Sequence, residues 1–317
     1  MGKVVVGIDI SKKTFDVSFK NKHGKWTHSN FENTSKGCIQ FNEWICQHNI
    51  GDIHVVMEAT GRYSEKLSYY CYNLGLSISV VNPARIKYYG QSKLSRTKTD
   101  KADARLIADF AMHNEVGLWV PKSPARAKLQ ELMRCMDNLK GDKTCLMNRI
   151  EGNSDKDIIK IYESLISNIQ KNIDNLEKQI LDIVKKDEGL NRDYNNLCSY
   201  PGIGQWTALA VLSEVPDIEM FEHVKQLTAY AGLNPSIRQS GTSVSGRGSI
   251  SKMGSSQLRK SLYMPALVAR KHNLKLKAFG DRLKAKGKKP KEVIVACMRK
   301  MLETIFWILK KQEPYKA

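Results

Sequence analysis

Residues 3–20 read KVVVGIDISKKTFDVSFK, and this stretch predicts the opening of an α/β domain. An apolar run over 3–10 and a second strand pattern over 14–20 are joined by three polar residues, as in a β-hairpin. Residues 25–31 are consistent with a third antiparallel strand. One acidic residue, Asp9, lies at the end of the first apolar strand, and polar residues follow it.

The order of the elements that follow indicates the fold. We expect a helix over 35–48, a strand over 53–57, a helix over 64–74 and a strand over 77–81 closed by Asn82-Pro83. A further helix begins near Asp100. Three antiparallel strands followed by alternating helices and strands is the order of the RNase H-like fold, so the sequence predicts an α/β domain of that kind.

Four acidic residues occupy the places where such a domain carries its acids. Asp9 and Glu58 each end a strand, and Asp100 and Asp103 lie three residues apart at the opening of a helix, where they share one face. Together they could converge on a pair of divalent cations. The alternative is ordinary helix capping, because a helix N-terminus favours negative charge without any ligand.

The composition points to a polyanionic partner. The chain has 51 Lys and Arg against 32 Asp and Glu, a net charge of +19, and nucleic acid is the commonest partner of so basic a chain. The seven cysteines are scattered without a C-x-x-C pair, which predicts reduced core residues and neither a disulfide framework nor a zinc site. The histidines lack metal-ligand spacing. We therefore expect any metal to be held by oxygen ligands. Neither a secretory signal nor an apolar run near ~18 residues occurs, so we expect a cytoplasmic protein without a membrane span.

Long helical patterns follow a linker near 116–124. We expect three domains, at 1–120, 121–192 and 193–317. In the middle one, apolar residues recur at nearly heptad spacing, which predicts either a coiled coil of about 40 Å or an antiparallel hairpin packed within one chain. This seam consists of Tyr162, Leu165, Ile169, Ile173, Leu176, Ile180 and Ile183.

A Pro-Gly-x-Gly turn at 201–204 separates two helical patterns and resembles a helix-hairpin-helix. Gly202 and Gly204 would let the backbone approach a DNA phosphate, which the amides of the next helix would bind. Any Pro-Gly connection between helices looks similar, so a purely structural turn is the alternative. No Gly-Lys-Ser/Thr follows, which excludes a nucleotide-binding P-loop of that type.

The C-terminal third combines a hydroxyl-rich loop with a basic region. Residues 236–250 read SIRQSGTSVSGRGSI, which indicates an exposed loop suited to phosphate or, alternatively, a flexible linker. From Arg259 to Lys300 there are fourteen Lys and Arg against two acids. We expect Arg247, Arg259 and Lys260 to contact nucleic acid.

Taken together, these motifs resemble the insertion-sequence DEDD transposases, the family that includes the Piv-like DNA invertases. The resemblance covers nearly the whole chain, and it depends on the order and spacing of motifs that are individually weak. They are the strand with Asp9, Glu58-Ala59-Thr60-Gly61, Thr99-Asp100-Lys101-Ala102-Asp103-Ala104, Pro201-Gly202-Ile203-Gly204, Tyr230-Ala231-Gly232-Leu233 and Ser240-Gly241.

The resemblance implies a RuvC-like catalytic domain, a coiled-coil segment and a C-terminal transposase domain with a serine nucleophile. It also implies dependence on Mg²⁺, or Mn²⁺ in its place, and assembly as dimers to tetramers. Target choice would come from a non-coding bridge RNA that pairs with donor and target duplex DNA. Asp9, Glu58, Asp100 and Asp103 match the family's four acids.

Ser240 matches the family's serine. Family members commonly have two serines before the glycine, whereas this chain has Gln239 before Ser240. The working hydroxyl could therefore belong to Ser240, Ser243 or Ser245.

Three other readings remain open from the residues. A junction-resolving nuclease would keep the fold and use water as its nucleophile. The stretch 7–14 also resembles the first phosphate loop of sugar-kinase and actin-like ATPases, but no second Asp-x-Gly loop follows. A non-catalytic nucleic-acid-binding protein would need only the basic region, and the four acids would be caps.

Overall fold

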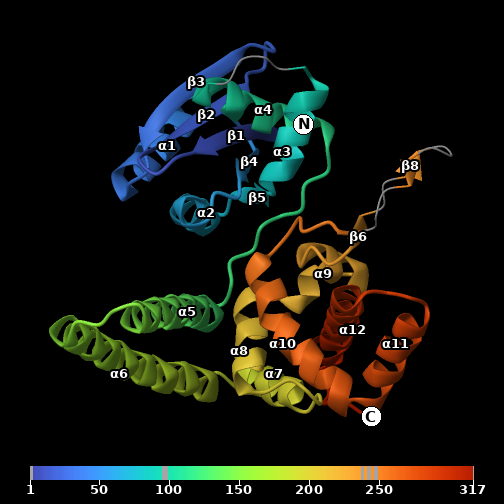
Figure 1. The fold of residues 1–317 in the computed structure, drawn as a ribbon. Coiled ribbons are helices and arrows are strands. Elements are labelled where there is room, and N and C mark those ends of the chain that lie inside the picture. Colours follow the sequence, from blue (N-terminus) through green and yellow to red (C-terminus); the bar gives the residue numbers. More distant parts are fainter. Residues whose placement is uncertain (1–2, 95–98, 237–238, 241–243, 246–248, 317) are drawn as a thin grey trace. The chain divides into compact units, whose positions relative to one another are not determined.

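The computed structural model describes residues 3–94, 99–236, 239–240, 244–245 and 249–316. The chain folds as two compact units, Met1–Pro121 and Lys122–Ala317 (Figure 1). The first is a mixed α/β unit, and the second is mostly helical. The division of the second unit into separate domains at 121–192 and 193–317 stays a prediction.

The first unit is built on one five-stranded sheet with the strand order β3-β2-β1-β4-β5. Strands β1, β2 and β3 are antiparallel neighbours, and β4 and β5 run parallel to β1. This arrangement is consistent with the RNase H-like order expected from the sequence. The bounds are β1 Val4–Ile10, β2 Thr14–Lys20, β3 Trp26–Glu32, β4 Ile53–Glu58 and β5 Ser77–Val81.

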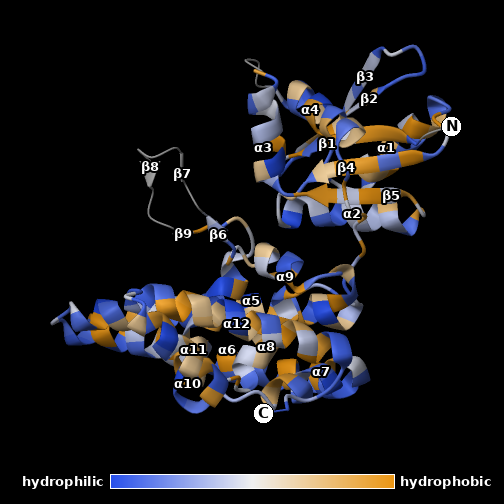
Figure 2. Ribbon diagram, turned by 90° about the vertical axis from the view of Figure 1, so that its right-hand side faces the viewer, coloured by the Kyte–Doolittle hydropathy of each residue, from blue (hydrophilic) through white to orange (hydrophobic). Residues whose placement is uncertain are grey.

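Helices cover both faces of the sheet. Helices α1 (Ser35–Gln47) and α2 (Arg62–Asn73) pack on the face that carries Ile8 and Val17. Helices α3 (Pro83–Ser92) and α4 (Asp100–His113) pack on the other face. The apolar colour of β1, β4 and β5 in Figure 2 reflects this burial from both sides. Asp9 lies on the face that α4 covers, because strand side chains alternate between faces.

One helix of the first unit was not expected from the sequence. Asn82-Pro83 was interpreted as the end of a strand, whereas it also begins α3. The Asn82 side chain accepts a hydrogen bond from the Ala84 amide at 2.9 Å, and Pro83 occupies the first helical position. Proline is suited to that position because its missing N–H would have had no partner there. The same dipeptide can thus close a strand and open a helix.

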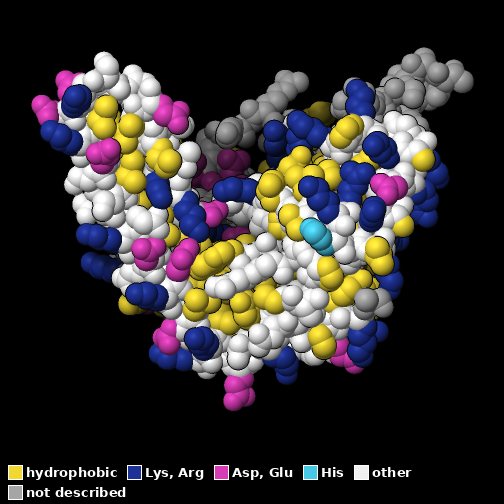
Figure 3. Space-filling model, turned by 60° about the horizontal axis from the view of Figure 1, so that its bottom comes forward, with side chains coloured by type: hydrophobic (Ala, Val, Ile, Leu, Met, Phe, Trp, Pro, Cys, Tyr) yellow, Lys and Arg dark blue, Asp and Glu magenta, His cyan; other side chains and the backbone are white. Residues whose placement is uncertain are grey.

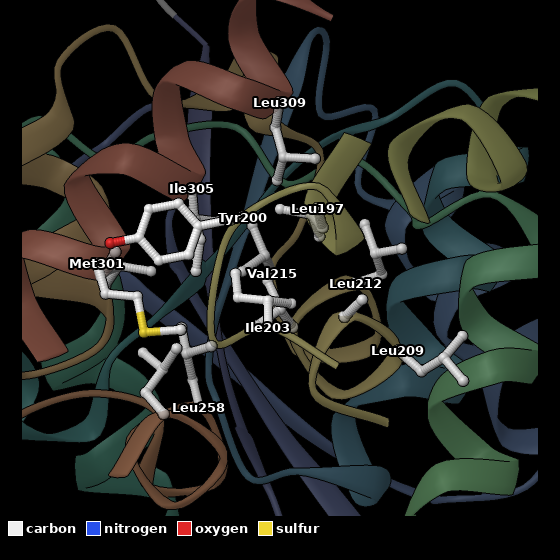
Figure 4. Close-up of a cluster of buried hydrophobic side chains, with 14 of the residues drawn as sticks. Leu197, Tyr200, Ile203, Leu209, Leu212, Val215, Leu258, Met301, Ile305 and Leu309 are labelled. Atoms are coloured by element: carbon white, nitrogen blue, oxygen red, sulfur yellow. The ribbon is translucent and has the colours of Figure 1, made fainter. Parts of the chain in front are cut away.

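Helices make up most of the second unit, and one extensive apolar core joins them. Figure 4 shows part of this core, where Leu197, Tyr200 and Ile203 pack with Met301 and Ile305. The bounds are α5 Pro124–Glu151, α6 Lys156–Lys186, α7 Glu188–Cys198, α8 Gln205–Glu214, η1 Ile218–Met220, α9 Val224–Tyr230, α10 Ser256–His272, α11 Leu274–Ala285 and α12 Pro290–Lys311.

The near-heptad seam lies in α6, which packs side by side with α5 as an antiparallel hairpin of one chain (Figure 1). Ile173 and Ile180 are buried, and they share a core with Leu129 and Met136 of α5. Of the two structures that the seam predicted, the single-chain hairpin is present. Near the N-terminus of α6, the Ile161 side chain is 60% exposed. Helix α5 therefore does not cover all the apolar side chains along α6.

The stretch expected to be an exposed loop contains four two-residue strands among its described residues. They are β6 Pro235–Ser236, β7 Gln239–Ser240, β8 Val244–Ser245 and β9 Ser249–Ile250. β6 pairs with β9, and β7 pairs with β8, both antiparallel. We call residues 235–250 the arm.

The seven cysteines are all free thiols, as the sequence predicted, but only Cys38, Cys71 and Cys297 are buried. The prediction of core positions is wrong for Cys46, Cys135 and Cys145, which are exposed. Within the described ranges, none of the helices is both long and apolar enough to cross a membrane.

Candidate active site

The acid cluster, defined as Asp9, Glu58, Asp100 and Asp103, is assembled by the first unit alone. Asp9 is the penultimate residue of β1, and Glu58 is the last residue of the neighbouring parallel strand β4. Each lies one residue beyond the paired positions Ile8 and Met57. Because parallel neighbours end at the same edge and paired residues share a face, the two carboxylates lie side by side.

Helix α4 packs on the face of the sheet that carries Asp9, and its first turn supplies the other two acids, Asp100 and Asp103. A glycine allows its close approach: a Cβ on Gly7 would lie 2.3 Å from the Ala104 oxygen and 2.4 Å from the Ala108 nitrogen. Gly7 precedes Asp9 by two residues in β1. The missing side chain therefore lets the first turn of α4 bring Asp100 and Asp103 near Asp9.

Neither of these two carboxylates is the N-cap of α4. The N-cap of α4 is Thr99, whose side chain accepts a hydrogen bond from the Ala102 amide at 3.2 Å. Asp100 and Asp103 follow it in the first turn, where the helix dipole still favours a negative charge. The N-cap is thus a residue outside the acid cluster, and the helix dipole remains an alternative reason for acids at positions 100 and 103.

Electrostatics show that the acids act on one another. Partial burial raises the pKa of Asp9 from its ordinary 3.8 to about 6, and the charges of Asp103, Asp100 and Glu58 add to the effect in that order. Burial, followed by the charge of Asp103, also raises the pKa of Glu58. Carboxylates that repel one another in this way are stabilised by a cation among them.

The donor set fits a hard divalent cation, because all four side chains offer carboxylate oxygens. Within the described part of the chain, however, no three His, Cys, Asp or Glu side chains have the arrangement of a formed metal site. The four acids are close enough to interact electrostatically, and they are not drawn together around one point.

A fifth acid beside the cluster was missed in the sequence. Asp16 in β2 pairs directly with Asp9 across the strands, is 7% exposed, and contributes to the raised pKa of Asp9. Its two oxygens are held by β3: Asn30 donates from Nδ2 at 2.6 Å, and His28 Nε2 lies 3.2 Å away. The strand register could have revealed Asp16, because a short turn between 10 and 14 places position 16 opposite position 9.

The serine candidates lie in the second unit. Ser240 is in β7, paired with Val244, and Ser245 is in β8, paired with Gln239. Ser243 and Arg247 lie outside the described residues. The roles of all three serines and of Arg247 stay predictions.

The two glycines of the predicted phosphate turn have different surroundings. Gly202 has a φ of +105°, and a Cβ on it would lie 2.5 Å from the Ala269 side chain of α10. A glycine at position 202 is therefore already explained by the positive φ and by close packing against α10. Gly204 is the exposed N-cap of α8 and has open space around it. Phosphate binding at this turn remains untested.

The two described basic residues of the predicted nucleic-acid site are already paired. Nη1 of Arg259 donates to the carbonyl oxygens of Ala231, Gly254 and Ser255 at 2.8, 3.2 and 3.3 Å. Lys260 is largely exposed and forms an ion pair with Asp137 at 3.1 Å. Arg259 thus has a structural partnership that its sequence context did not indicate.

Two protein-family models match this chain, and several named proteins are similar to it in sequence. A transposase family model of the DEDD IS110 type matches residues 6–153, and a model described as "Transposase IS116/IS110/IS902 family" matches residues 194–281. The chain is 34% identical to the pilin gene-inverting protein of Moraxella lacunata, over 99% of this chain and 98% of that one. The Moraxella bovis protein of the same name shows the same identity and coverage.

A protein named as a transposase is also similar to this chain. The chain is 26% identical to the transposase for insertion sequence element IS1111A of Coxiella burnetii, over 99% of this chain and 91% of that protein. These comparisons span nearly the whole chain, so the aligned region covers the stretches that carry the acid cluster and the arm.

Proposed function

The chain belongs to the IS116/IS110/IS902 transposase family of DNA-processing enzymes, and we propose that it cleaves and rejoins DNA at specific sites with Mg²⁺ and a serine nucleophile. The observation that carries this proposal is the acid cluster. The charges of Asp100 and Asp103 from α4 and of Glu58 from β4 all act on Asp9, and that of Asp16 from β2 adds to them. Such clustering is costly for a protein unless a cation compensates it.

The acid cluster would hold the metal through carboxylate oxygens. Mg²⁺ is the expected ion because it prefers oxygen ligands, and Mn²⁺ should substitute for it. When bound, the ion supplies Lewis-acid stabilisation to the oxygens of a DNA phosphate. Asp16, whose oxygens are occupied by Asn30 and His28, would add negative charge without being a ligand.

Ser240 would supply the nucleophile. Its oxygen would bond to the phosphorus of a DNA phosphodiester, while the bond from phosphorus to one sugar oxygen breaks. The hydroxyl proton leaves to solvent, and the departing sugar oxygen takes one up. The phosphodiester energy is retained in the protein–DNA bond, so attack by another DNA end can rejoin the strands. The names of the Moraxella relatives, which describe the inversion of a gene, suit such a reaction.

Guidance by a bridge RNA is proposed from family membership and from the net charge of +19. Figure 3 shows Lys and Arg side chains spread over much of the face that it presents, as expected for phosphate contact. Such contacts do not distinguish sequences, whereas pairing with a guide does. Sequence-specific DNA binding that survives complete ribonuclease treatment would argue against a guide.

Assembly as dimers or tetramers is proposed from the family and from the apolar residues exposed on α6. Ile158, Ile161 and Leu165 are 39%, 60% and 45% exposed in the hairpin, and exposed apolar stripes of this kind commonly mark contacts between chains. Light scattering of wild type and of Ile161→Asp would test this assembly.

The experiment that tests the proposed reaction is detection of a covalent adduct. Purified protein with its copurified RNA and Mg²⁺ should convert labelled DNA into a species that comigrates with protein on a denaturing gel. Ser240→Ala should abolish the adduct while preserving DNA binding, and Ser236→Ala in strand β6 is the matched control. Metal-dependent cleavage without any adduct would favour the nuclease that uses water.

A further inference from the structure

The arm is joined to its unit through a narrow base. We define the arm base as residues 230–234, which lead into the arm, and residues 251–255, which return from it. Three backbone bonds join the two segments. The Ser251 amide donates to Asn234 O at 2.8 Å, the Lys252 amide to Gly232 O at 3.1 Å, and the Ser255 amide to Tyr230 O at 2.8 Å. The two segments therefore form one paired base, and the strand pair β6–β9 continues from it.

Two glycines permit the close approach of the segments. Gly232 has a φ of +66°, and Gly254 has a φ of +149°. A Cβ on Gly254 would lie 2.2 Å from Tyr230 O, and one on Gly232 would lie 2.6 Å from Nη1 of Arg259. The arm base thus has no room for other side chains at these two positions.

Arg259 of α10 ties both segments to the helical core. One nitrogen, Nη1, donates to Ala231 O in the entering segment and to Gly254 O and Ser255 O in the returning one. Its two hydrogens are shared among three carbonyl oxygens. A lysine could carry the same charge, but its ammonium group is compact and lacks the planar fork that fixes the direction of each donor.

Glu214, the last residue of α8, holds the arm base from the other side. Its Oε2 accepts a hydrogen bond from Ser255 Oγ at 3.3 Å, and its backbone oxygen accepts one from the Tyr230 hydroxyl at 3.2 Å. Gln130 and Arg134 of α5 both donate to its Oε1 at 3.3 Å. Glu214 is 8% exposed. This carboxylate therefore links the arm base to two helices of the core.

We propose that Arg259 and Glu214 are positioning residues for Ser240, because they hold the arm base from which the chain continues to that serine. The proposal rests on the proposed function of Ser240 as nucleophile. A nucleophile reacts only in the small fraction of arrangements that align it with the phosphate, so loosening its support lowers the rate without weakening DNA binding. This role differs from the phosphate contact that the sequence predicted for Arg259.

The test is single-turnover adduct formation at saturating DNA, below the melting temperature of each variant. It yields a rate constant, which reports positioning, and an amplitude, which reports the fraction of competent protein. For Arg259→Met we expect the rate constant to fall about 100-fold, with the amplitude and the DNA dissociation constant within about twofold of wild type. For Arg259→Lys and Glu214→Gln, which are less disruptive, we expect falls of about 10-fold.

Arg270→Met is the matched control, since Arg270 lies in the same helix and pairs with Asp281 at 3.2 Å, outside the arm base. It should lower stability and leave the rate constant unchanged. Hydrogen exchange at the Lys252 and Ser255 amides should accelerate in Arg259→Met and stay unchanged in Arg270→Met.

Two results would overturn the proposal and are distinguishable from each other. A reduced amplitude with an unchanged rate constant in the Arg259 variants would mean that Arg259 only stabilises the fold. If the wild-type protein itself forms no adduct, the serine reaction is wrong, and no positioning role for the arm base remains.

Discussion

The four acids lie on two central strands and a helix packed directly against them, whereas Ser240 lies in a two-residue strand of an arm tied to its unit by a few hydrogen bonds. The positions of the acids follow from strand pairing and from the close packing at Gly7. The arm base, by contrast, is held by Arg259 and Glu214 through a small number of hydrogen bonds. Substitutions should therefore affect the two regions differently.

The largest loss of DNA cleavage is expected from a substitution in the acid cluster. Asp103→Asn keeps the shape of the side chain and removes a charge that acts on both Asp9 and Glu58. Loss of a metal ligand removes several kcal/mol of transition-state stabilisation, so cleavage should fall by about 1000-fold or more. Asp109→Asn is the control, because Asp109 lies in the same helix but accepts from the Tyr89 hydroxyl. Full cleavage by Asp103→Asn would remove this residue from the site.

Gly7→Ala tests whether close packing positions α4. A methyl group there would meet the Ala104 oxygen and the Ala108 nitrogen, so the helix must shift away from β1. We expect a loss of about 1–3 kcal/mol of stability and a fall in cleavage of about 100-fold. In the control, Gly51→Ala, a Cβ meets nothing within 4 Å. Unfolding by urea and cleavage assays measure both effects, and wild-type cleavage by Gly7→Ala would contradict the role of this contact.

The raised pKa of Asp9 predicts how stability changes with pH in the absence of metal. Between about pH 4 and 6 the folded protein binds more protons at Asp9 than the unfolded chain does, so the free energy of unfolding decreases as pH rises through this range. The Asp9→Asn variant has no carboxyl group at this position, so its free energy of unfolding should not decrease in this way as pH rises. It should be about 1–2 kcal/mol more stable than wild type at pH 7.5, after allowance for partial exposure, and nearly equal to it at pH 4.

Added Mg²⁺ should reverse the order of the two proteins at pH 7.5, because only wild type retains the full set of carboxylates. Urea denaturation at both pH values, with and without Mg²⁺, measures the free energy of unfolding of the two proteins. A lower stability of Asp9→Asn in metal-free buffer at pH 7.5 would contradict the repulsion that we derive.

The smallest effect is expected at Lys260 on the second unit. This lysine is exposed and paired with Asp137, so Lys260→Ala should change stability by less than about 1 kcal/mol. If it also contacts a phosphate, DNA affinity should fall a few-fold, and the slope of log K against log salt should fall by about 1. Lys160→Ala, which removes an ion pair of the same 3.1 Å length with Asp157, is the control, and equal salt slopes for both variants would exclude the contact.

The sequence predicted the regular parts of the first unit well because they depend on periodicity. Short apolar runs revealed the strands of the sheet, and Asp9 and Glu58 stood out as acids at strand ends. Asp16 was not predicted as part of the site because only its pairing with Asp9 across the hairpin brings it beside the acid cluster. Helix α3 escaped notice because Asn82-Pro83 is equally suited to ending a strand and starting a helix.

The surroundings of the arm could not be predicted in the same way. Arg259 binds carbonyl oxygens, which every residue has, so nothing in the sequence marks its partner Ala231, 28 positions away. No sequence motif marks Glu214 either, because only the fold brings Ser255 and Arg134 to its carboxylate. Contacts between a side chain and a distant backbone leave no pattern of spacing.

The most direct test of the serine reaction is mass spectrometry of the covalent adduct. Trypsin cleaves after Arg238 and Arg247, which releases residues 239–247, QSGTSVSGR, with all three candidate serines in one short peptide. After nuclease digestion of the DNA, we expect this peptide to carry a nucleotide whose fragment ions assign it to Ser240, and only when Mg²⁺ was present. A nucleotide on Ser243 or Ser245, or an unmodified peptide in a reaction that has cleaved its DNA, would contradict the assignment of Ser240 as the nucleophile.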